Sequence, residues 1–351
     1  MSTIYVTGTQ GNDTVDSYIG EWSPLHIETY AGDDAIYGGG GNDTLLGGEG
    51  KDTILGGFGN DSVDGGDGDD TITDGGSSLI HTGYDIVFGG SGNDSIWYKN
   101  DLDASTFYGG SGNDGITGGS GNDTIYGDDG VYQEAADGTT YNDYIRGGIG
   151  NDLIYGGIGN DTIRGSNGEG SDVVYGGAGD DLIEYTYDNS SVTISGDDGN
   201  DTIRGGTASD VINGGAGNDG IAGLGGNDIL TGGSGSDGFG LRRGDGVDKI
   251  TDFSSAHDGD VIGIYASDFN LVVGAGLNSD RTLNSDYFEL SSAATKTHGE
   301  FLFYASPNNT FTLAWDADGR RGGAAQTLAT FDNAEGLSAS EFLHASDFYV
   351  S

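Results

Sequence analysis

Hydrophobic and polar positions repeat with a period of nine residues over most of the chain. Residues 38–73 read GGGGNDTLL, GGEGKDTIL, GGFGNDSVD and GGDGDDTIT, and related units continue to residue 240. The eighth position is almost always aliphatic, and the three residues centred on it are typical of a very short strand with one inward side chain and two outward neighbours. The glycines that open each unit predict a tight turn. The period therefore predicts a solenoid of short strands.

An aspartate recurs at the sixth position, two residues before the aliphatic one. Twenty aspartates keep this register: Asp13, Asp34, Asp43, Asp52, Asp61, Asp70, Asp85, Asp94, Asp114, Asp123, Asp143, Asp152, Asp161, Asp172, Asp181, Asp201, Asp210, Asp219, Asp228 and Asp237. Carboxylate oxygens suit calcium, and glycines let main-chain carbonyl groups approach an ion. A single aspartate of this kind would be a turn residue that caps its own backbone. Twenty in register indicate a metal-binding array.

The period is interrupted in two ways. Three units keep the apolar position but replace the aspartate, by Leu25, Ser105 and Val192. Extra residues enter at 74–82 and 127–142. Insertions in a solenoid usually lie in loops at its edge, so we expect them to leave the repeat intact. The segment 127–142 is long enough to have a function of its own.

Composition limits the classes of function. The 72 glycines occur with two prolines and no G-X-Y period, which excludes collagen. The formal charge of −45 excludes binding to nucleic acid as the main activity. Apolar residues make up 34% of the chain, enough for a core, so a cation is expected to neutralise the carboxylates before that core forms. Cysteine is absent, which excludes disulfides and thiolate metal sites.

The unit G-G-x-G-x-D-x-U-x resembles the nonapeptide of RTX proteins, calcium-binding proteins exported by bacterial type I secretion. The resemblance covers about residues 8–240. It implies an all-β fold, a parallel β-roll in which two nonapeptides form one turn. It also implies calcium ions between successive turns, held by loop carbonyls and by aspartates one turn apart. The pairs implied are Asp34/Asp52, Asp43/Asp61, Asp52/Asp70, Asp143/Asp161, Asp201/Asp219, Asp210/Asp228 and Asp219/Asp237.

The nonapeptide period ends at Gly240. Residues 244–253, GDGVDKITDF, resemble the strand that closes the roll in RTX proteins. Four strand-like apolar runs follow: Val261–Tyr265, Phe301–Tyr304, Phe311–Trp315 and Thr327–Phe331. We therefore expect a calcium-binding roll over residues 1–240 and a β-sandwich-like cap over 241–351, because a solenoid needs its open end covered.

The two ends of the chain bear on export. The N-terminal residues MSTIYVTGTQGNDTV lack the features of a secretory signal peptide, and no stretch is apolar enough to span a membrane. The C-terminal residues Asp347, Phe348, Tyr349 and Val350 resemble the tail of RTX proteins exported by type I secretion. The resemblance implies an extracellular or cell-surface protein exported without an N-terminal signal peptide, with a secretion signal inside 241–351.

Catalytic motifs are missing from the sequence. None of the five histidines lies in an H-E-x-x-H motif, which argues against a zinc protease. No G-x-S-x-G motif occurs, which argues against a lipase. Acidic pairs occur throughout, so their proximity does not indicate a glycosidase. We expect a protein that is not an enzyme; an enzyme built on the insertions is the least favoured alternative.

Outward positions supply a candidate interface. Alternate units place Phe88, Tyr108, Tyr126, Tyr155 and Tyr175 on one face, on consecutive turns. Such a row either stabilises the roll by cross-strand stacking or marks a binding surface. The leading hypothesis is a non-catalytic protein of the bacterial surface or extracellular matrix that self-associates or adheres, as surface-layer or filament subunits do. The alternative is a carbohydrate-binding module that binds cell-surface polysaccharide through this row.

Overall fold

The computed structural model describes residues 3–16, 22–75, 82–99, 101–129, 141–165, 168, 170–254, 258–269, 288–289, 300–306, 310–317, 325–332 and 347–350. Of the two insertions, the described part includes 74–75, 82, 127–129 and 141–142. The chain divides into two compact units, residues 1–184 and 185–351. The described residues hold one 3-10 turn, Ala266–Phe269, and otherwise strands, so the predicted all-β parallel roll is confirmed.

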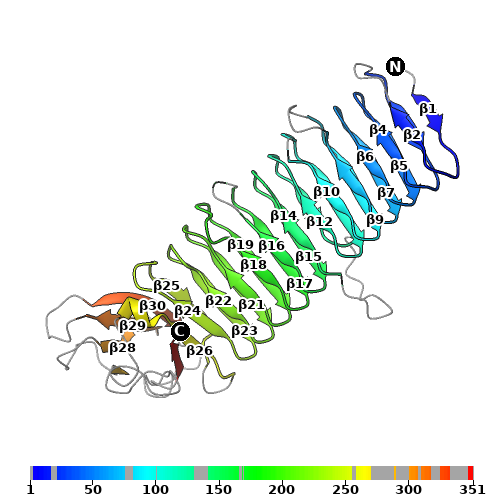
Figure 1. Cartoon of the computed structure of the whole chain (residues 1–351). Helices are drawn as coiled ribbons and strands as arrows, with labels where there is room; N and C mark the ends of the chain where they lie inside the picture. The colour runs from blue at the N-terminus through cyan, green and yellow to red at the C-terminus, as the bar shows by residue number, and fades with distance from the viewer. Residues whose placement is uncertain are drawn as a thin grey trace. The chain divides into compact units, whose positions relative to one another are not determined.

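The first unit consists of two parallel sheets whose strands alternate along the chain (Figure 1). One sheet contains β1 (Ile4–Thr7), β3 (Leu25–Glu28), β5 (Thr44–Glu49), β7 (Ser62–Asp67), β9 (Ile86–Ser91), β11 (Thr106–Ser111), β13 (Thr124–Tyr126), β15 (Leu153–Ile158) and β17 (Val173–Ala178). The other contains β2 (Thr14–Asp16), β4 (Ala35–Tyr37), β6 (Thr53–Leu55), β8 (Thr71–Thr73), β10 (Ser95–Trp97), β12 (Gly115–Thr117), β14 (Tyr144–Arg146), β16 (Thr162–Arg164) and β18 (Leu182–Glu184). Each strand pairs with the strand one turn later, so two nonapeptides form one turn as the resemblance implies.

The core of the roll is one side chain deep on each sheet. The eighth-position residues pair in register along each sheet, as Ile54 does with Ile72 and Ile154 with Val174. Ile54, Ile72 and Ile154 are fully buried. The residues on either side of them point outward and are exposed or half-buried, for example Thr53 and Leu55 around Ile54. One buried residue between two outward-pointing residues is therefore enough to specify each of these three-residue strands.

The turns depend on glycine because successive loops stack closely. Gly48 has a φ of 111°, a conformation that residues with a Cβ adopt only under strain. A Cβ added to Gly48 would overlap the carbonyl group of Tyr30 in the preceding turn. The second and fourth positions of most loops share this positive φ, which explains the high glycine content.

The second unit continues the same pattern and adds an antiparallel sheet. Its repeat strands are β19 (Thr193–Asp198), β20 (Thr202–Arg204), β21 (Val211–Ala216), β22 (Gly220–Ala222), β23 (Ile229–Ser234) and β24 (Gly238–Leu241). The strands after Leu241 are β25 (Asp248–Ile250), β26 (Val261–Ile264), β27 (Phe288–Glu289), β28 (Glu300–Ser306), β29 (Thr310–Asp316), β30 (Gln326–Asp332) and β31 (Phe348–Val350). β25 and β26 pair in parallel with β23 and β24. Parallel pairing of the roll thus extends beyond residue 240, while the domain boundary drawn there stays a prediction.

The C-terminal strands pack aromatic side chains. β28, β29 and β30 form an antiparallel sheet, and β30 and β31 pair in parallel with β25 and β26 (Figure 1). Phe301 lies 4.7 Å from Trp315 and 4.9 Å from Phe269, measured between ring centroids. Phe303 and Phe331 are also fully buried. This region is held by a compact aromatic core rather than by single aliphatic residues.

Candidate metal centre

The sixth-position aspartates form two columns, one at the turns that precede odd-numbered strands and one at the turns that precede even-numbered strands. Along each column, the main-chain N–H of one aspartate donates to Oδ1 of the aspartate one turn later. The seven pairs implied by the resemblance all have this bond, at 2.8–2.9 Å. One carboxylate oxygen of each downstream aspartate therefore satisfies the preceding loop.

The insertions do not disturb this arrangement. Asp61 N–H donates to Asp85 Oδ1 at 2.8 Å across residues 74–82. Asp114 N–H donates to Asp143 Oδ1 at 2.7 Å across residues 127–142. The aspartates before and after each insertion therefore meet as they do in the uninterrupted repeats.

The second carboxylate oxygen of most of these aspartates has no hydrogen-bond partner among the described residues. Buried Oδ2 atoms of this kind belong to Asp34, Asp43, Asp52, Asp61, Asp70, Asp94, Asp114, Asp143, Asp161, Asp219, Asp228 and Asp237. These side chains are at most 3% exposed. A buried ionised carboxylate without a partner costs several kcal/mol or more, so each oxygen needs a proton or a cation.

Burial shifts the ionisation of these groups. It raises the pKa of Asp61 to about 8 and that of Asp143 to about 9, with neighbouring aspartates contributing a smaller increase. Desolvation and like charges both disfavour the ionised form. At neutral pH such carboxyl groups hold a proton unless a bound cation replaces it.

The unpartnered oxygens face main-chain carbonyl oxygens. A Cβ added to Gly47, the first residue of its loop, would touch both Asp52 Oδ2 and the carbonyl oxygen of Gly65 in the next turn. The same convergence occurs at Gly38, Gly65, Gly89, Gly109, Gly127, Gly156, Gly196 and Gly214. Among the described residues, no three acidic, histidine or cysteine side chains come together. The donors that do converge are hard oxygens, half of them from the main chain, and this set fits calcium.

The fold and this donor set define a parallel β-roll with metal-binding loops. A family model described as the RTX calcium-binding nonapeptide repeat matches residues 26–54, 46–76, 81–103, 100–131, 137–169, 168–185, 193–221, 204–239 and 221–248. These segments cover more than half of the chain, which therefore belongs to the RTX repeat family. Repeats of this family bind calcium ions. A search of curated proteins found none that matches the chain.

Nineteen of the twenty predicted aspartates are buried. Asp13, the first of them, is half-buried, and its carboxylate accepts hydrogen bonds from the N–H and hydroxyl group of Thr9. Within each of the two units, the aspartates of this set lie in two such columns. Their assignment as calcium ligands stays a prediction.

Asp248 and Asp260 extend the columns beyond the predicted set. Asp248 Oδ1 accepts from Asp228 N–H at 3.2 Å, and Asp260 Oδ1 accepts from Asp237 N–H at 3.0 Å. Both side chains are at most 4% exposed. Each precedes an isoleucine by two residues, Ile250 and Ile262, so the D-x-U part of the motif was the signal that could have found both.

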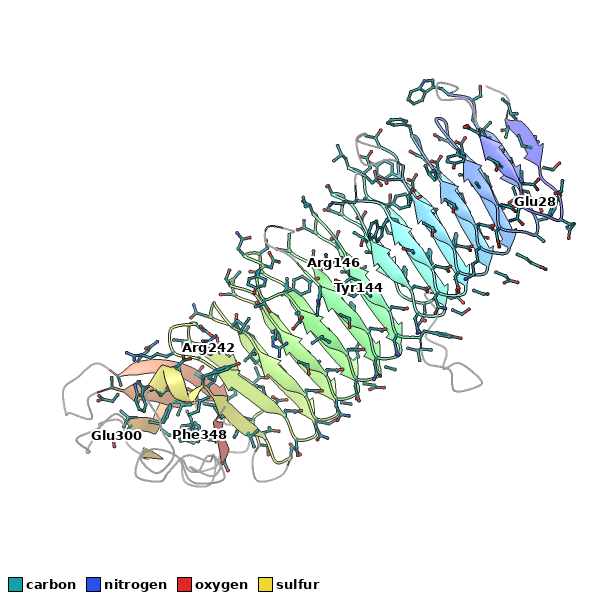
Figure 2. The ribbon with its side chains drawn as sticks, in the orientation of Figure 1. Glu28, Tyr144, Arg146, Arg242, Glu300 and Phe348 are labelled. Atoms are coloured by element: carbon teal, nitrogen blue, oxygen red, sulfur yellow. The ribbon has the colours of Figure 1, made fainter. Side chains whose placement is uncertain are left out.

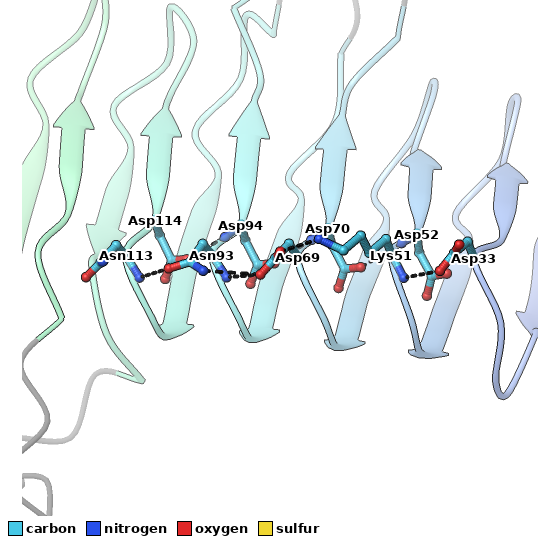
Figure 3. Close-up of polar contacts among 9 residues, drawn as sticks. All are labelled: Asp33, Lys51, Asp52, Asp69, Asp70, Asn93, Asp94, Asn113 and Asp114. Atoms are coloured by element: carbon cyan, nitrogen blue, oxygen red, sulfur yellow. Dashed lines mark hydrogen bonds and ion pairs between the residues drawn. The ribbon is translucent and has the colours of Figure 1, made fainter.

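The fifth positions form two further columns, one beside each column of aspartates. Asn60 N–H donates to Asn42 Oδ1 at 3.1 Å before odd-numbered strands, and Asn113 N–H donates to Asn93 Oδ1 at 3.0 Å before even-numbered strands. Figure 3 shows the second of these columns, which also contains Lys51 in an ion pair with Asp69. The G-N-D triplet therefore combines an asparagine that satisfies the next loop with an aspartate that faces the metal-binding position.

Proposed function

We propose that the chain is a secreted, non-catalytic protein whose roll folds on calcium and which then self-associates through one aromatic face. The carboxylate Oδ2 atoms and the first-position glycine carbonyls hold the ions between turns. Calcium supplies the positive charge that keeps these buried carboxylates ionised. RTX β-roll repeats are generally non-catalytic, which agrees with the missing catalytic motifs.

A stacked row of aromatic rings on the first unit carries the proposal of self-association. We call the residues Phe88, Tyr108, Tyr126, Tyr155 and Tyr175 the aromatic row. Successive ring centroids lie 4.8–5.0 Å apart and successive ring planes are within 7° of parallel. Phe88 is 39% exposed and its neighbour Ile86 is 46% exposed. A continuous partly apolar surface of this kind is what interfaces use.

The stacking argues against the carbohydrate alternative. The three inner rings, Tyr108, Tyr126 and Tyr155, have a neighbouring ring against both faces. A sugar that stacks on an aromatic side chain needs a free ring face, whereas these rings present edges and hydroxyl groups. Ring edges and hydroxyl groups pack well against another protein surface. A second copy of the chain is therefore the better fit.

The outer face of the other sheet of this unit is mixed: it carries the exposed Trp97 together with arginine and glutamate side chains. Arg146 lies over the ring of Tyr144, with 5.3 Å between its guanidinium carbon and the ring centroid (Figure 2). Arg164 forms an ion pair with Glu184 at 3.1 Å. These contacts engage the charged groups within the sheet, so the aromatic row is the more suitable docking surface.

Bound calcium also removes the main obstacle to association. The formal charge of −45 opposes contact between copies. Each ion bound in the columns brings two positive charges to a region of buried carboxylates. Association is therefore expected to require the calcium-loaded roll.

Export follows from the family and from the C-terminal tail. RTX repeat proteins are typically exported. The tail strand β31 pairs with β26, and Phe348 is fully buried. In the described residues, no helix is both long and apolar enough to cross a bilayer. We propose an extracellular or cell-surface location.

The test replaces Tyr108, Tyr126 and Tyr155 together by serine. We expect calcium-induced folding, followed by circular dichroism, to stay nearly intact and calcium-dependent association, measured by sedimentation velocity, to be lost. The matched control replaces the same three residues by phenylalanine, which keeps the stack and its area. Association of the serine variant with an unchanged concentration midpoint would show that the aromatic row only stabilises the roll. A monomeric wild-type protein that binds polysaccharide would overturn self-association instead.

A further inference from the structure

Two turns of the odd column have an architecture that differs from every glycine-rich loop described above. They are residues 98–105 and 185–192, which we call the Tyr turns. Each begins with tyrosine, has aspartate three residues later, and ends at a position where the repeat aspartate is replaced, by Ser105 or Val192. Residues 18–25 have a related spacing of Tyr, Glu and Leu, but 17–21 lie outside the described residues.

The two Tyr turns share one hydrogen-bond pattern. The N–H of Asp101 donates to the carbonyl of Tyr98 at 2.9 Å, and that of Asp188 to the carbonyl of Tyr185 at 2.8 Å. Each aspartate then accepts, through Oδ1, the N–H two residues later, from Asp103 at 3.2 Å and from Ser190 at 3.1 Å. Two unrelated stretches of sequence thus build the same turn, which indicates a defined structural element rather than a degenerate repeat.

The glycine-rich loop that follows each Tyr turn is altered as a consequence. The aspartate carbonyl of the turn accepts the third-position N–H of that loop, from Ser120 to Asp101 at 2.8 Å and from Thr207 to Asp188 at 2.7 Å. The second-position glycines, Gly119 and Gly206, are without the positive φ that this position has in most loops.

In both of these loops, main-chain N–H groups donate hydrogen bonds to the carboxylate of the repeat aspartate, so that it needs no metal. Gly119 N–H donates to Asp123 Oδ2 at 2.9 Å, and Gly206 N–H donates to Asp210 Oδ2 at 2.7 Å. Their Oδ1 atoms accept the N–H of Ser105 and Val192 in the usual way. Both carboxylate oxygens therefore already accept an N–H, unlike the unpartnered Oδ2 atoms of the neighbouring loops. A glycine carbonyl of the next turn still lies near each Oδ2, because a Cβ added to Gly118 or Gly205 would touch both atoms.

The sequence of the second altered loop agrees with its changed backbone conformation. It reads Gly-Gly-Thr-Ala-Ser-Asp over residues 205–210, with alanine at the fourth position, where most loops have a glycine with positive φ. Ala208 is tolerated because the loop after a Tyr turn does not adopt that conformation.

The Tyr98 side chain also fills space beside an upstream loop. It is fully buried and packs edge-on against Phe107, 5.0 Å between centroids. A Cβ added to Gly56 would meet Asp61 Oδ2 at 3.1 Å and the Tyr98 hydroxyl oxygen at 3.3 Å. At Gly38 and Gly47 the corresponding partner is a glycine carbonyl of the next loop. The Tyr98 hydroxyl group thus lies where a regular loop has a glycine carbonyl oxygen that could bind calcium.

From these contacts we propose that Asp123 and Asp210, in the loops that follow the Tyr turns, are hydrogen-bonded structural residues rather than calcium ligands, so that these loops are metal-free joints. The proposal does not extend to Asp188 in the second Tyr turn, whose Oδ2 is buried without a hydrogen-bond partner. The odd column is then divided into separate groups of ions, whereas the even column keeps an aspartate at every described repeat turn. The inference rests on the calcium-loaded roll proposed above and refines which of its loops take part.

The experiment counts calcium ions per molecule on the full chain, by native mass spectrometry and by isothermal titration. Asp123→Ala and Asp210→Ala are compared with Asp114→Ala and Asp219→Ala, whose Oδ2 atoms are unpartnered. We expect the first pair to keep the wild-type number at saturation and the second pair to lose at least one ion each. Equal losses in both pairs would overturn the metal-free joint. A wild-type chain that binds no calcium would instead overturn the proposed function.

A gain-of-function variant covers the case in which an alanine variant fails to fold. Residues 98–105 are replaced by Gly-Gly-Ser-Gly-Asn-Asp, the loop that occurs at 118–123. We expect at least one additional bound calcium ion, with circular dichroism reporting the fold. A folded variant with the wild-type ion count would show that the Tyr turn does not exclude the metal.

Discussion

The repeats and the C-terminal strands bury apolar surface in different ways. Most repeat strands contribute one buried aliphatic residue, and many of the loops beside them bury unpartnered carboxylate oxygens. The strands after residue 264 bury large rings instead, with Phe301, Phe303, Trp315 and Phe331 in contact distance of other aromatic rings. We therefore expect the repeats to depend on an ion for stability, whereas the C-terminal region has an aromatic core of its own.

Calcium removal is expected to have the largest effect. With excess chelator the repeat region should lose most of its β-structure, because folding without a cation requires each buried carboxyl group either to take up a proton or to stay ionised without a partner. Far-UV circular dichroism reports the repeats, and Trp315 fluorescence in a Trp22→Phe, Trp97→Phe variant reports the C-terminal core. The Trp315 signal should change less. Full β-structure in excess chelator would show that the repeats, like the C-terminal core, fold without an ion.

Removal of the C-terminal region should come next. Deletion of residues 241–351 takes away β25 and β26, which pair with the last repeat strands, and the aromatic core behind them. Stability in a solenoid comes from nearest neighbours, so the repeats should stay largely unfolded even in calcium. Circular dichroism against calcium concentration checks this. Folding with the midpoint of the whole chain would show that the repeats need no cap.

The pH dependence of the calcium-free chain tests whether protons can replace calcium in the repeats. Burial raises the folded-state pKa of Asp114 to about 7 and that of Asp61 to about 8, above the ordinary value of 3.8. A raised pKa contributes stability below about pH 4 that is lost as pH rises to the folded values. In chelator we therefore expect partial β-structure near pH 4 that disappears by about pH 8. With calcium the same titration should run in the opposite direction, because the ion competes with protons.

A matched pair of glycines gives the smallest expected effect. Gly48→Ala places a Cβ against the Tyr30 carbonyl at positive φ, so we expect a loss of about 1–3 kcal/mol and a higher calcium midpoint. Gly115→Ala is the control, because the nearest atom to its added Cβ lies 3.8 Å away. It should be neutral or slightly stabilising. Equal shifts in calcium titrations would show that backbone conformation does not limit the loops.

Most members of the odd and even columns could be predicted from residue types and their spacing alone. The D-x-U spacing placed all twenty aspartates in the columns, and the pairs Asp34/Asp52 and Asp219/Asp237 meet as the resemblance implied. Asp248 was missed because its unit was interpreted as the closing strand, although Gly244, Gly246 and the D-x-I spacing keep the repeat pattern there. The fifth-position asparagine columns were missed because asparagine beside glycine is equally typical of an isolated turn.

The sequence by itself determined the period, the all-β class, the aliphatic core and the presence of a calcium array, because each is a local pattern repeated many times. The tertiary structure decided which carboxylate oxygens are left for an ion. Asp114 and Asp123 belong to the same motif, yet Asp114 Oδ2 is unpartnered and Asp123 Oδ2 accepts the N–H of Gly119. The difference originates in the Tyr turn one turn earlier in the same column, and contacts between stacked turns cannot be read from a single nonapeptide.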